Sequence, residues 1–336
     1  MPLNWLEAYA TLSVTGGKMS AELLSSLDKP PRSKANTIWA DYIELRCLIH
    51  PDQYFSLDGA EEALHEADDY SADAEEQNQT NSNEGLDKLD AKWTDCEHII
   101  QQRAQRLGDA YPFALANGYR GIEVSTTADT PLRQWYRFLL LSASLQYVPA
   151  HNALTSAFER ASLSTFRHLQ PAGSEVHGFW PGAHHYPDDK PGRLTKLAED
   201  LRTTPIFADN AFLEGDRGDG GIDLVAWHPL GDTRDLIPIS IGQCGCSVTD
   251  WKTKPLSVTP HNLNRKLPIP NAYWSFYFMP LDMISPTGRW ADGSGELPGV
   301  IVIDRTRFIE LASQVGVPLP EEATAQVARL DEFRYR

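Results

Sequence analysis

Two short segments, Gly218–Trp227 and Leu236–Cys244, constrain the fold most, because together they predict an antiparallel β-hairpin. The first has a glycine-rich entry into an apolar run that begins at Ile222, and the second is rich in β-branched residues from Ile237 to Gln243. Residues 228–235 between them contain Pro, Gly and Asp, which favour a reversal of the chain. The sequence therefore predicts a pair of buried, antiparallel strands.

The register of this hairpin brings two oxygen-bearing side chains together. If Asp223 faces Gln243, both lie on one face of the sheet with the apolar side chains of the pair. The apolar partners are then Val225 with Ile241 and Trp227 with Ile239. A carboxylate and an amide oxygen that meet at a strand end suit a hard divalent cation such as Mg²⁺. Spacing alone leaves a second interpretation open, in which Gln243 is an ordinary polar residue at the end of a buried strand.

A resemblance to a known family adds to this prediction. Residues 218–223, Gly-Asp-Gly-Gly-Ile-Asp, followed by Gln243-Cys244, resemble the core motif of PD-(D/E)XK nucleases, most closely that of Mrr-type restriction endonucleases. The resemblance covers about residues 153–312. It implies an α/β protein with a helical N-terminal domain and a restriction-endonuclease-like core, in which helices flank a central mixed β-sheet. It also implies a metal-dependent endonuclease that hydrolyses phosphodiester bonds of DNA in bacterial restriction or phage defence.

The same resemblance assigns the metal ligands. In such nucleases an aspartate, a glutamate or glutamine, and the backbone carbonyl of the next residue bind Mg²⁺ or Mn²⁺. These ligands correspond to Asp223, Gln243 and the carbonyl of Cys244. The family's core opens with a helix that carries a Phe-Glu pair, which corresponds to Phe158-Glu159, so Glu159 is expected to complete the metal site.

The catalytic lysine of the family has no direct counterpart, because Gly245 follows Cys244. We expect Lys252 or Lys254 to reach back to the site, since a flexible amine need not start from position 245. Related nuclease-like sequences have Gln-Cys followed by Trp-x-x-Lys, a pattern that Trp251 and Lys254 match. Lys254 is therefore the preferred candidate.

The net charge of the chain is unusual for an enzyme that acts on nucleic acid, but most of it is local. Phosphate binding depends on Lys and Arg, whereas this chain has a formal net charge of −16. Residues 58–97 contain 14 acids and 2 lysines, so −12 of that charge is local. Few apolar residues occur between 58 and 85, which predicts a mobile acidic insertion that is either solvated or bound to a basic partner.

Two alternatives to an autonomous nuclease follow. The acidic insertion and Gly245 in place of lysine suggest a catalytically inactive nuclease-fold subunit that acts as a protein-interaction partner in a defence complex. A third interpretation is a nuclease that stays silent until a partner or second messenger engages the N-terminal domain. Double-stranded DNA is the expected main partner, with a protein bound through the N-terminal domain or the insertion, and a second copy of the chain, as further candidates.

Pro149–Asn152 is the predicted boundary between a mostly helical domain of residues 1–150 and a nuclease domain of residues 151–336. The chain has no apolar segment long enough to span a bilayer and no secretion signal, so a cytoplasmic protein without a membrane partner is expected. The four cysteines and the His184-His185 pair lack further ligands at zinc-site spacing. Reduced thiols and surface histidines are therefore expected.

Hydrophobic periodicity predicts the remaining elements. Helices are expected over residues 36–49, 86–107, 131–148, 153–169, 193–201 and 304–312, with a last helix in the tail. Strands are expected at 121–124, 175–180, 272–279 and 299–303.

Overall fold

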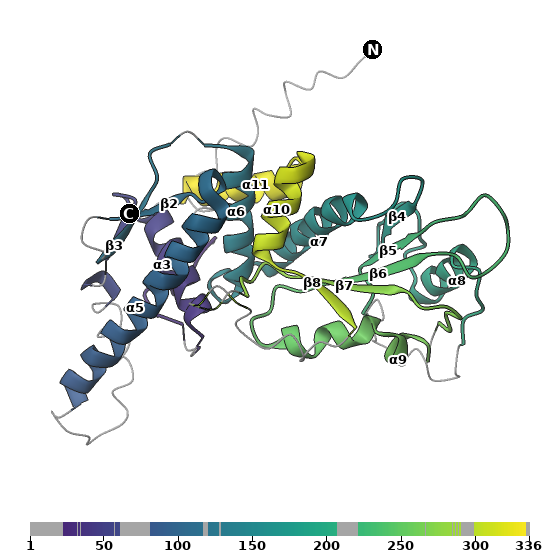
Figure 1. Cartoon of the computed structure of the whole chain (residues 1–336), viewed down its shortest axis with the longest axis horizontal. Helices are drawn as coiled ribbons and strands as arrows, with labels where there is room; N and C mark the ends of the chain where they lie inside the picture. Colours follow the sequence, from purple (N-terminus) through teal and green to yellow (C-terminus); the bar gives the residue numbers. More distant parts are fainter. Residues whose placement is uncertain are drawn as a thin grey trace, which may run out of the picture.

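The computed structural model describes residues 23–31, 33, 35–56, 58–60, 81–116, 120–127, 129–206, 221–265, 267–283, 285, 287, 289 and 299–333, with only the backbone for 81–89. Figure 1 shows an elongated molecule, with the first helices at one end and a twisted sheet at the other. Helices from the middle of the sequence (residues 131–168) and from its C-terminal part (residues 305–332) lie between them. The chain is a mixed α/β protein, which confirms the predicted class.

The larger sheet of the described residues has five strands in the order β4-β5-β6-β7-β8. Their bounds are Glu175–Gly178, Leu224–Trp227, Ile239–Cys244, Trp274–Phe278 and Val300–Ile303. Strand β5 is antiparallel to both of its neighbours, β4 and β6, whereas β6, β7 and β8 run parallel to one another. The sheet is therefore mixed, and its central strand β6 ends at the same edge as its parallel neighbour β7.

The hairpin register predicted from the sequence is confirmed. Val225 pairs with Ile241 and Trp227 with Ile239. The backbone N–H of Asp223 donates to the carbonyl of Gly242 across 3.0 Å, which continues the pairing beyond the end of β5. Because alternate side chains point to opposite faces, Asp223 and Gln243 fall on the same face, as the alternation required.

Different elements cover the two faces of this sheet. Helix α7 (His151–His168) covers the face that carries Leu224, Phe276 and Phe278, through side chains such as Phe166. The other face carries Val225, Trp227, Ile239 and Ile241. Helix α8 (Lys190–Asp200), the 3₁₀ segment η5 (Lys254–Val258) and the short helix α9 (Pro260–Leu263) cover that second face. Each strand of the hairpin is thus buried on both sides.

The N-terminal part combines helices with a small sheet that the sequence only partly predicted. The helices are α3 (Asn36–Ile49), α5 (Asn81–Leu107) and α6 (Pro131–Ala143), with 3₁₀ turns η2 (Gly108–Ala110) and η3 (Leu145–Tyr147). The sheet has the order β1-β3-β2, with bounds Tyr54–Ser56, Gly121–Val124 and Phe113–Leu115. Only the strand at 121–124 was predicted, because three-residue strands are too short to show alternation.

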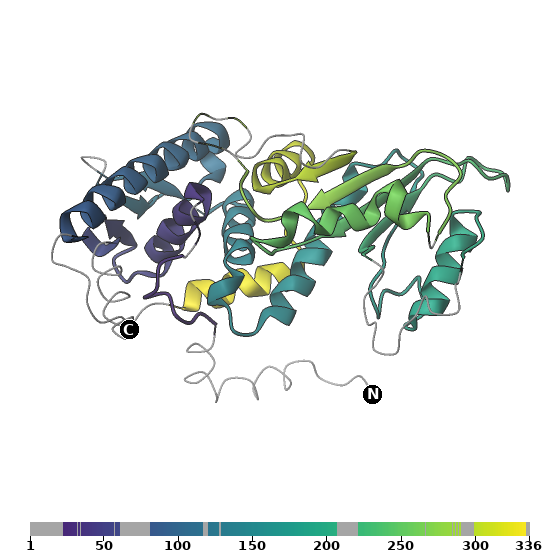
Figure 2. The same ribbon diagram turned by 90° about the horizontal axis from the view of Figure 1, so that it is seen from below.

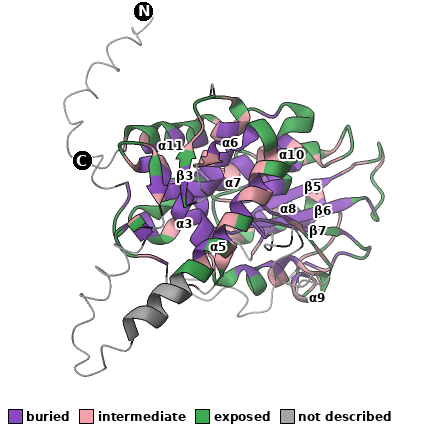
Figure 3. Cartoon of the chain, turned by 60° about the vertical axis from the view of Figure 1, so that its left-hand side comes forward, coloured by how far each residue is buried: buried purple, intermediate pink, exposed green. Residues whose placement is uncertain are grey.

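The last two helices join the N-terminal part to the sheet. Helix α10 (Arg305–Val315) follows β8, and α11 (Glu321–Glu332) packs on α6 and α7, as Figure 2 shows from below. Phe308 of α10 contacts Trp135 of α6 and Phe158 of α7, with ring centroids 6.1 and 5.7 Å apart. One hydrophobic core therefore includes residues from both sides of position 150, and the buried residues in Figure 3 run across it. The division into domains at that position stays a prediction.

The prediction of a mobile acidic insertion over residues 58–85 is wrong at the C-terminal end of that range, because α5 begins at Asn81. Asn and Ser are common at helix starts, and Glu84 is an acid near a helix N-terminus, so the segment suits the first turns of a helix. Residues 61–80, which form most of the predicted insertion, lie outside the described residues. Over the described ranges, the helices lack the combination of length and apolarity needed to cross a membrane.

Candidate active site

The site begins at Asp223, immediately before β5. Its side chain is buried at 5% exposure, and its Oδ2 atom accepts a hydrogen bond from the backbone N–H of Cys244 across 2.6 Å. This contact joins the start of β5 to the end of β6. The Asp223 carboxylate is therefore fixed at the edge of the sheet where β6 and β7 end.

Gln243 lies beside it at the end of β6 and is also buried, at 3% exposure. The Ser257 hydroxyl donates to Oε1 of Gln243 across 2.8 Å, and it lies 3.3 Å from the carbonyl oxygen of Gly221. Gly221 has a φ of +85°, and a Cβ placed on it would collide with the Ser257 side chain. This glycine of the motif is therefore required both by its backbone conformation and by the close approach of Ser257.

Sequence reasoning missed Ser257. It lies three positions after Lys254 in the 3₁₀ segment η5, and residues at that spacing are on the same side of a 3₁₀ turn. The spacing of three residues from Lys254 is the sequence feature that could have indicated Ser257.

The structure brings Lys254 to the site from this turn. Its Nζ atom donates to the carbonyl oxygen of Cys244 across 2.6 Å. The Nζ atom of Lys252 instead lies 5.0 Å from the centroid of the Trp251 ring. Since a carbonyl oxygen has two lone pairs, the Cys244 carbonyl that the resemblance assigns to metal binding has room for a second contact beside Lys254.

Glu159 approaches from α7, where it is half-buried. Burial raises the pKa of the Cys244 thiol well above its usual value, and the carboxylates of Asp223 and Glu159 raise it further. The positive charge of Lys254 lowers the pKa of the same thiol. The same two carboxylates also raise the pKa of the Cys246 thiol, in addition to the larger effect of burial. Two carboxylates and one ammonium thus act on this region, and both thiols are neutral at pH 7.

Tyr277 explains why no lysine stands at position 245. A Cβ placed on Gly245 would collide with the Tyr277 hydroxyl. Tyr277 lies on β7, paired with Gln243, and is fully buried. Its hydroxyl has no hydrogen-bond partner in the described part of the chain. The space in which a side chain of residue 245 would begin is therefore filled by a tyrosine from the neighbouring strand.

We expect Gly245→Ala to destabilise the protein by about 1–3 kcal/mol, because the added methyl group overpacks against Tyr277. Urea unfolding followed by circular dichroism measures the change. Tyr277→Phe in the same background removes the colliding hydroxyl and is expected to restore most of the loss. Tyr277→Phe alone, which removes a buried hydroxyl without a partner, is the matched control and is expected to be neutral or stabilising. Equal stability of Gly245→Ala and the wild type would contradict the collision.

The candidate site is not a cluster of the side chains that most often bind metal ions in proteins. Within the described ranges, no group of three or more His, Cys, Asp or Glu side chains is arranged to hold a metal ion. A cation at the hairpin end would therefore depend on the Gln243 amide and the Cys244 carbonyl as well as on carboxylates. Both are oxygen donors of the kind that Mg²⁺ accepts.

The predicted surface pair His184-His185 divides into two different environments. His184 is exposed, but His185 is half-buried and its Nε2 lies 2.8 Å from Oδ2 of Asp200. The His185 ring stacks on His177 with centroids 3.8 Å apart, and His177 stacks in turn on Trp227. The prediction is wrong for His185, because this stack across strands β4 and β5 covers part of its ring.

Comparisons with known proteins add no relative. No family model, no curated protein and no solved structure matches this chain. Functional assignment therefore depends on the geometry of the hairpin end and on the residues that converge there.

Proposed function

We propose that the protein is a metal-dependent endonuclease of double-stranded DNA with a restriction-endonuclease-like core. One observation carries the proposal, namely that Lys254 and Asp223 converge on Cys244. Nζ of Lys254 is 2.6 Å from the carbonyl oxygen of Cys244, and Oδ2 of Asp223 is 2.6 Å from its backbone nitrogen. An acid, an amine and the amide of Gln243 thus meet at one strand end, although they come from three separate segments.

The residues present fit a hard divalent cation, Mg²⁺ or Mn²⁺. The donors available are the carboxylates of Asp223 and Glu159, the Gln243 amide oxygen and the Cys244 carbonyl, all of them oxygen atoms. Two of these donors are carboxylates, and both act on the neighbouring thiols together with Lys254. Carboxylates that share a partly buried site favour a bound cation.

In the proposed mechanism the chain positions the phosphate and the attacking water. A bound cation supplies Lewis-acid stabilisation of the charge that develops on the phosphate. Asp223 and Gln243 are held rigidly by Cys244 and Ser257, so their oxygens keep a fixed geometry at the site. Lys254 supplies a positive charge and hydrogen-bond donors that orient the water or stabilise the transition state.

We expect Lys254→Met to lower the cleavage rate of plasmid DNA in Mg²⁺ or Mn²⁺ by roughly 10²-fold or more, because it removes the amine that donates to the Cys244 carbonyl. Lys252→Met, whose amine lies over Trp251, is the matched control and is expected to cleave at close to the wild-type rate. Gel assays of supercoiled and linear products measure both rates. Equal loss in the two variants would contradict the role assigned to Lys254.

A catalytically inactive nuclease-fold subunit is the second candidate. It is favoured because the Asp223 carboxylate and the Cys244 carbonyl already accept hydrogen bonds from other groups of this chain. Wild-type protein that leaves DNA intact in both Mg²⁺ and Mn²⁺, and that copurifies with a protein partner, would support this candidate over the endonuclease.

A further inference from the structure

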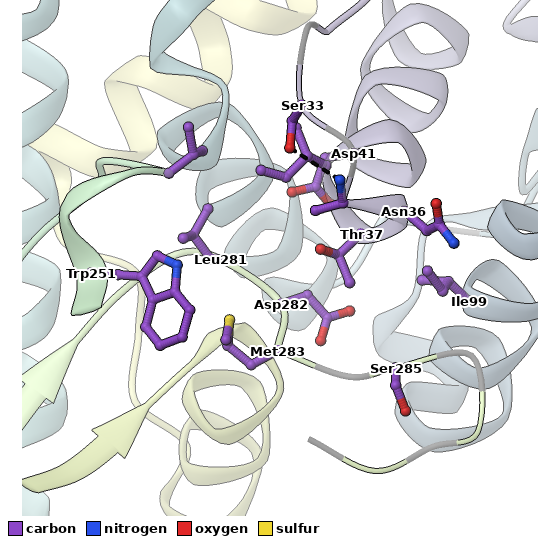
Figure 4. Close-up of a pocket in the computed structure, with 13 residues that line it drawn as sticks. Ser33, Asn36, Thr37, Asp41, Ile99, Trp251, Leu281, Asp282, Met283 and Ser285 are labelled. Carbon is purple, nitrogen blue, oxygen red and sulfur yellow. Dashed lines mark hydrogen bonds between the residues drawn. The ribbon is translucent and has the colours of Figure 1, made fainter. Parts of the chain in front are cut away.

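A pocket of about 380 Å³ lies between the N-terminal helices and the loops that follow β6 and β7. Thr37 and Asn36 line it from the first turn of α3, Val248 and Trp251 from the loop after β6, and Asp282 from the loop after β7. Figure 4 shows these loops facing the start of α3 across the pocket. This volume lies within the usual range for small-molecule sites, about 300–1,000 Å³.

One side of the pocket is acidic. Asp41 and Asp282 line it and are 5% and 2% exposed, respectively. Arg305 pairs with both oxygens of Asp41 across 2.8 Å, and Arg103 pairs with Oδ1 of Asp41 across 2.8 Å and with Oδ2 of Asp282 across 2.5 Å. The carboxylates are therefore fixed in place, and a carboxylate has about four acceptor positions, more than the arginine contacts of either acid occupy.

The charged side chains of the lining are hydrogen-bond acceptors, and their arginine partners lie behind them, outside the lining. Of the 13 described residues that line the pocket, none is Lys, Arg or His. A ligand phosphate would face two carboxylates without a cation in the lining, whereas a ligand with N–H donors would find acceptors.

The other side of the pocket is apolar and contains a large aromatic ring. Trp251 is 9% exposed and packs in one cluster with Leu281 and Met283. Figure 4 shows its indole beside Leu281 and Met283, on the opposite side of the pocket from Thr37 and Asp41. An aromatic surface with apolar neighbours suits a flat ring, and stacking on such a surface is favourable for any nucleobase.

We propose that this pocket binds a nucleobase that carries an exocyclic amine, with the ring against Trp251 and its N–H groups toward Asp41 or Asp282. The base belongs either to a free nucleoside or nucleotide, whose phosphate stays outside, or to a nucleotide extruded from DNA. The chemistry of the pocket is the same in both cases. Binding does not require the chain to be a nuclease.

The position of the pocket links it to the candidate active site. Trp251 belongs to the 3₁₀ turn η4 (Asp250–Lys252), and Lys254 opens the next turn, η5. A base in the pocket therefore contacts the segment that presents Lys254 to Cys244.

Isothermal titration calorimetry of the full chain with adenosine, guanosine, cytidine and uridine tests the proposal. At least one of the three amine-bearing nucleosides is expected to bind at least about tenfold more tightly than uridine, which lacks the amine. Thr37→Phe, which fills the pocket, and Trp251→Ala, which removes the ring, are each expected to weaken that binding at least about tenfold. Trp274→Ala is the matched control, because Trp274 is 63% exposed on β7 and does not line the pocket; it is expected to bind as the wild type does.

A second titration separates the two sources of the base. Duplex DNA with one 2-aminopurine, an amine-bearing base whose fluorescence rises when it leaves the stack, is titrated with protein in EDTA. A rise that Thr37→Phe abolishes identifies an extruded base as the occupant, whereas nucleoside binding without such a rise identifies a free nucleoside or nucleotide. The proposal is overturned if both titrations are negative, or if Thr37→Phe, folded by circular dichroism, responds as the wild type does. Cleavage is measured in neither titration, so failure here is distinct from failure of the nuclease assignment.

Discussion

Asp223→Asn is expected to lower the rate of DNA cleavage by about 10²–10³-fold or more, the loss expected when a charged group that acts on the transition state is removed. Asparagine has the shape of aspartate and keeps an oxygen that accepts the Cys244 N–H, so the hairpin end should remain folded. What the variant loses is the negative charge that, in the proposed mechanism, attracts the cation. Cleavage rates over a series of Mg²⁺ concentrations measure the effect.

Asp235→Asn is the matched control for this experiment. Asp235 is an exposed acid in the turn of the same hairpin, so its replacement changes the net charge equally without touching the site. It is expected to leave cleavage within about twofold of the wild type, as is usual for a surface substitution away from the site. If Asp223→Asn, with an unchanged melting temperature, cleaved DNA as fast as Asp235→Asn, the assignment of the site would be rejected.

Arg103→Ala is expected to lower the free energy of unfolding by about 3–5 kcal/mol, the typical cost of leaving buried charges without their partner. The Arg103 side chain is fully buried and pairs with Asp41, Glu44 and Asp282 at 2.8, 2.7 and 2.5 Å, respectively. Its removal takes a counter-charge from three buried carboxylates, of which Asp41 and Glu44 keep Arg305 close by. Urea unfolding, followed by both fluorescence and circular dichroism, measures the loss.

Arg120→Ala is the control for that loss. The Arg120 side chain is 68% exposed and lies 3.9 Å from Asp58, which is 84% exposed. Such a surface pair contributes about 0–1 kcal/mol, because water screens both charges. A loss below about 1 kcal/mol for Arg103→Ala would contradict the assignment of a buried network that stabilises the fold.

This network also connects distant parts of the chain. Asp41 and Glu44 lie on α3, Arg103 on α5, and Arg305 on α10 after the last strand of the sheet. The hydroxyls of Tyr111 and Tyr136 each donate a hydrogen bond to the Glu44 carboxylate across 2.6 Å. The N-terminal helices are therefore joined to the sheet by fixed buried contacts, which place the start of α3 opposite the loops after β6 and β7.

Much of the secondary structure could be predicted because its signals are local. The helix predicted at 36–49 is α3, and the predicted strand at 299–303 contains β8. Helix α8 begins earlier than periodicity indicated, at Lys190, because Asp189 caps it by accepting from the N–H of Gly192 across 2.7 Å. Helix α6 ends earlier than predicted, at Ala143, and the apolar run continues as the 3₁₀ turn η3. Periodicity identified the buried faces of these segments but not the hydrogen bonds at their ends.

By itself the sequence predicted the hairpin and the face that Asp223 shares with Gln243, because alternation along two adjacent strands places every second side chain on the buried face. The pairing of Val225 with Ile241 and of Trp227 with Ile239 confirms the predicted register. Only the tertiary structure showed that Lys254 reaches the site, that Tyr277 fills the space beside Gly245, and that Ser257 donates a hydrogen bond to Gln243. Those contacts join β6 to η5 and to β7, and they depend on how segments pack in space. A local sequence pattern does not predict such packing, because side chains from separate segments come into contact only when the sheet and the turns that cover it have formed.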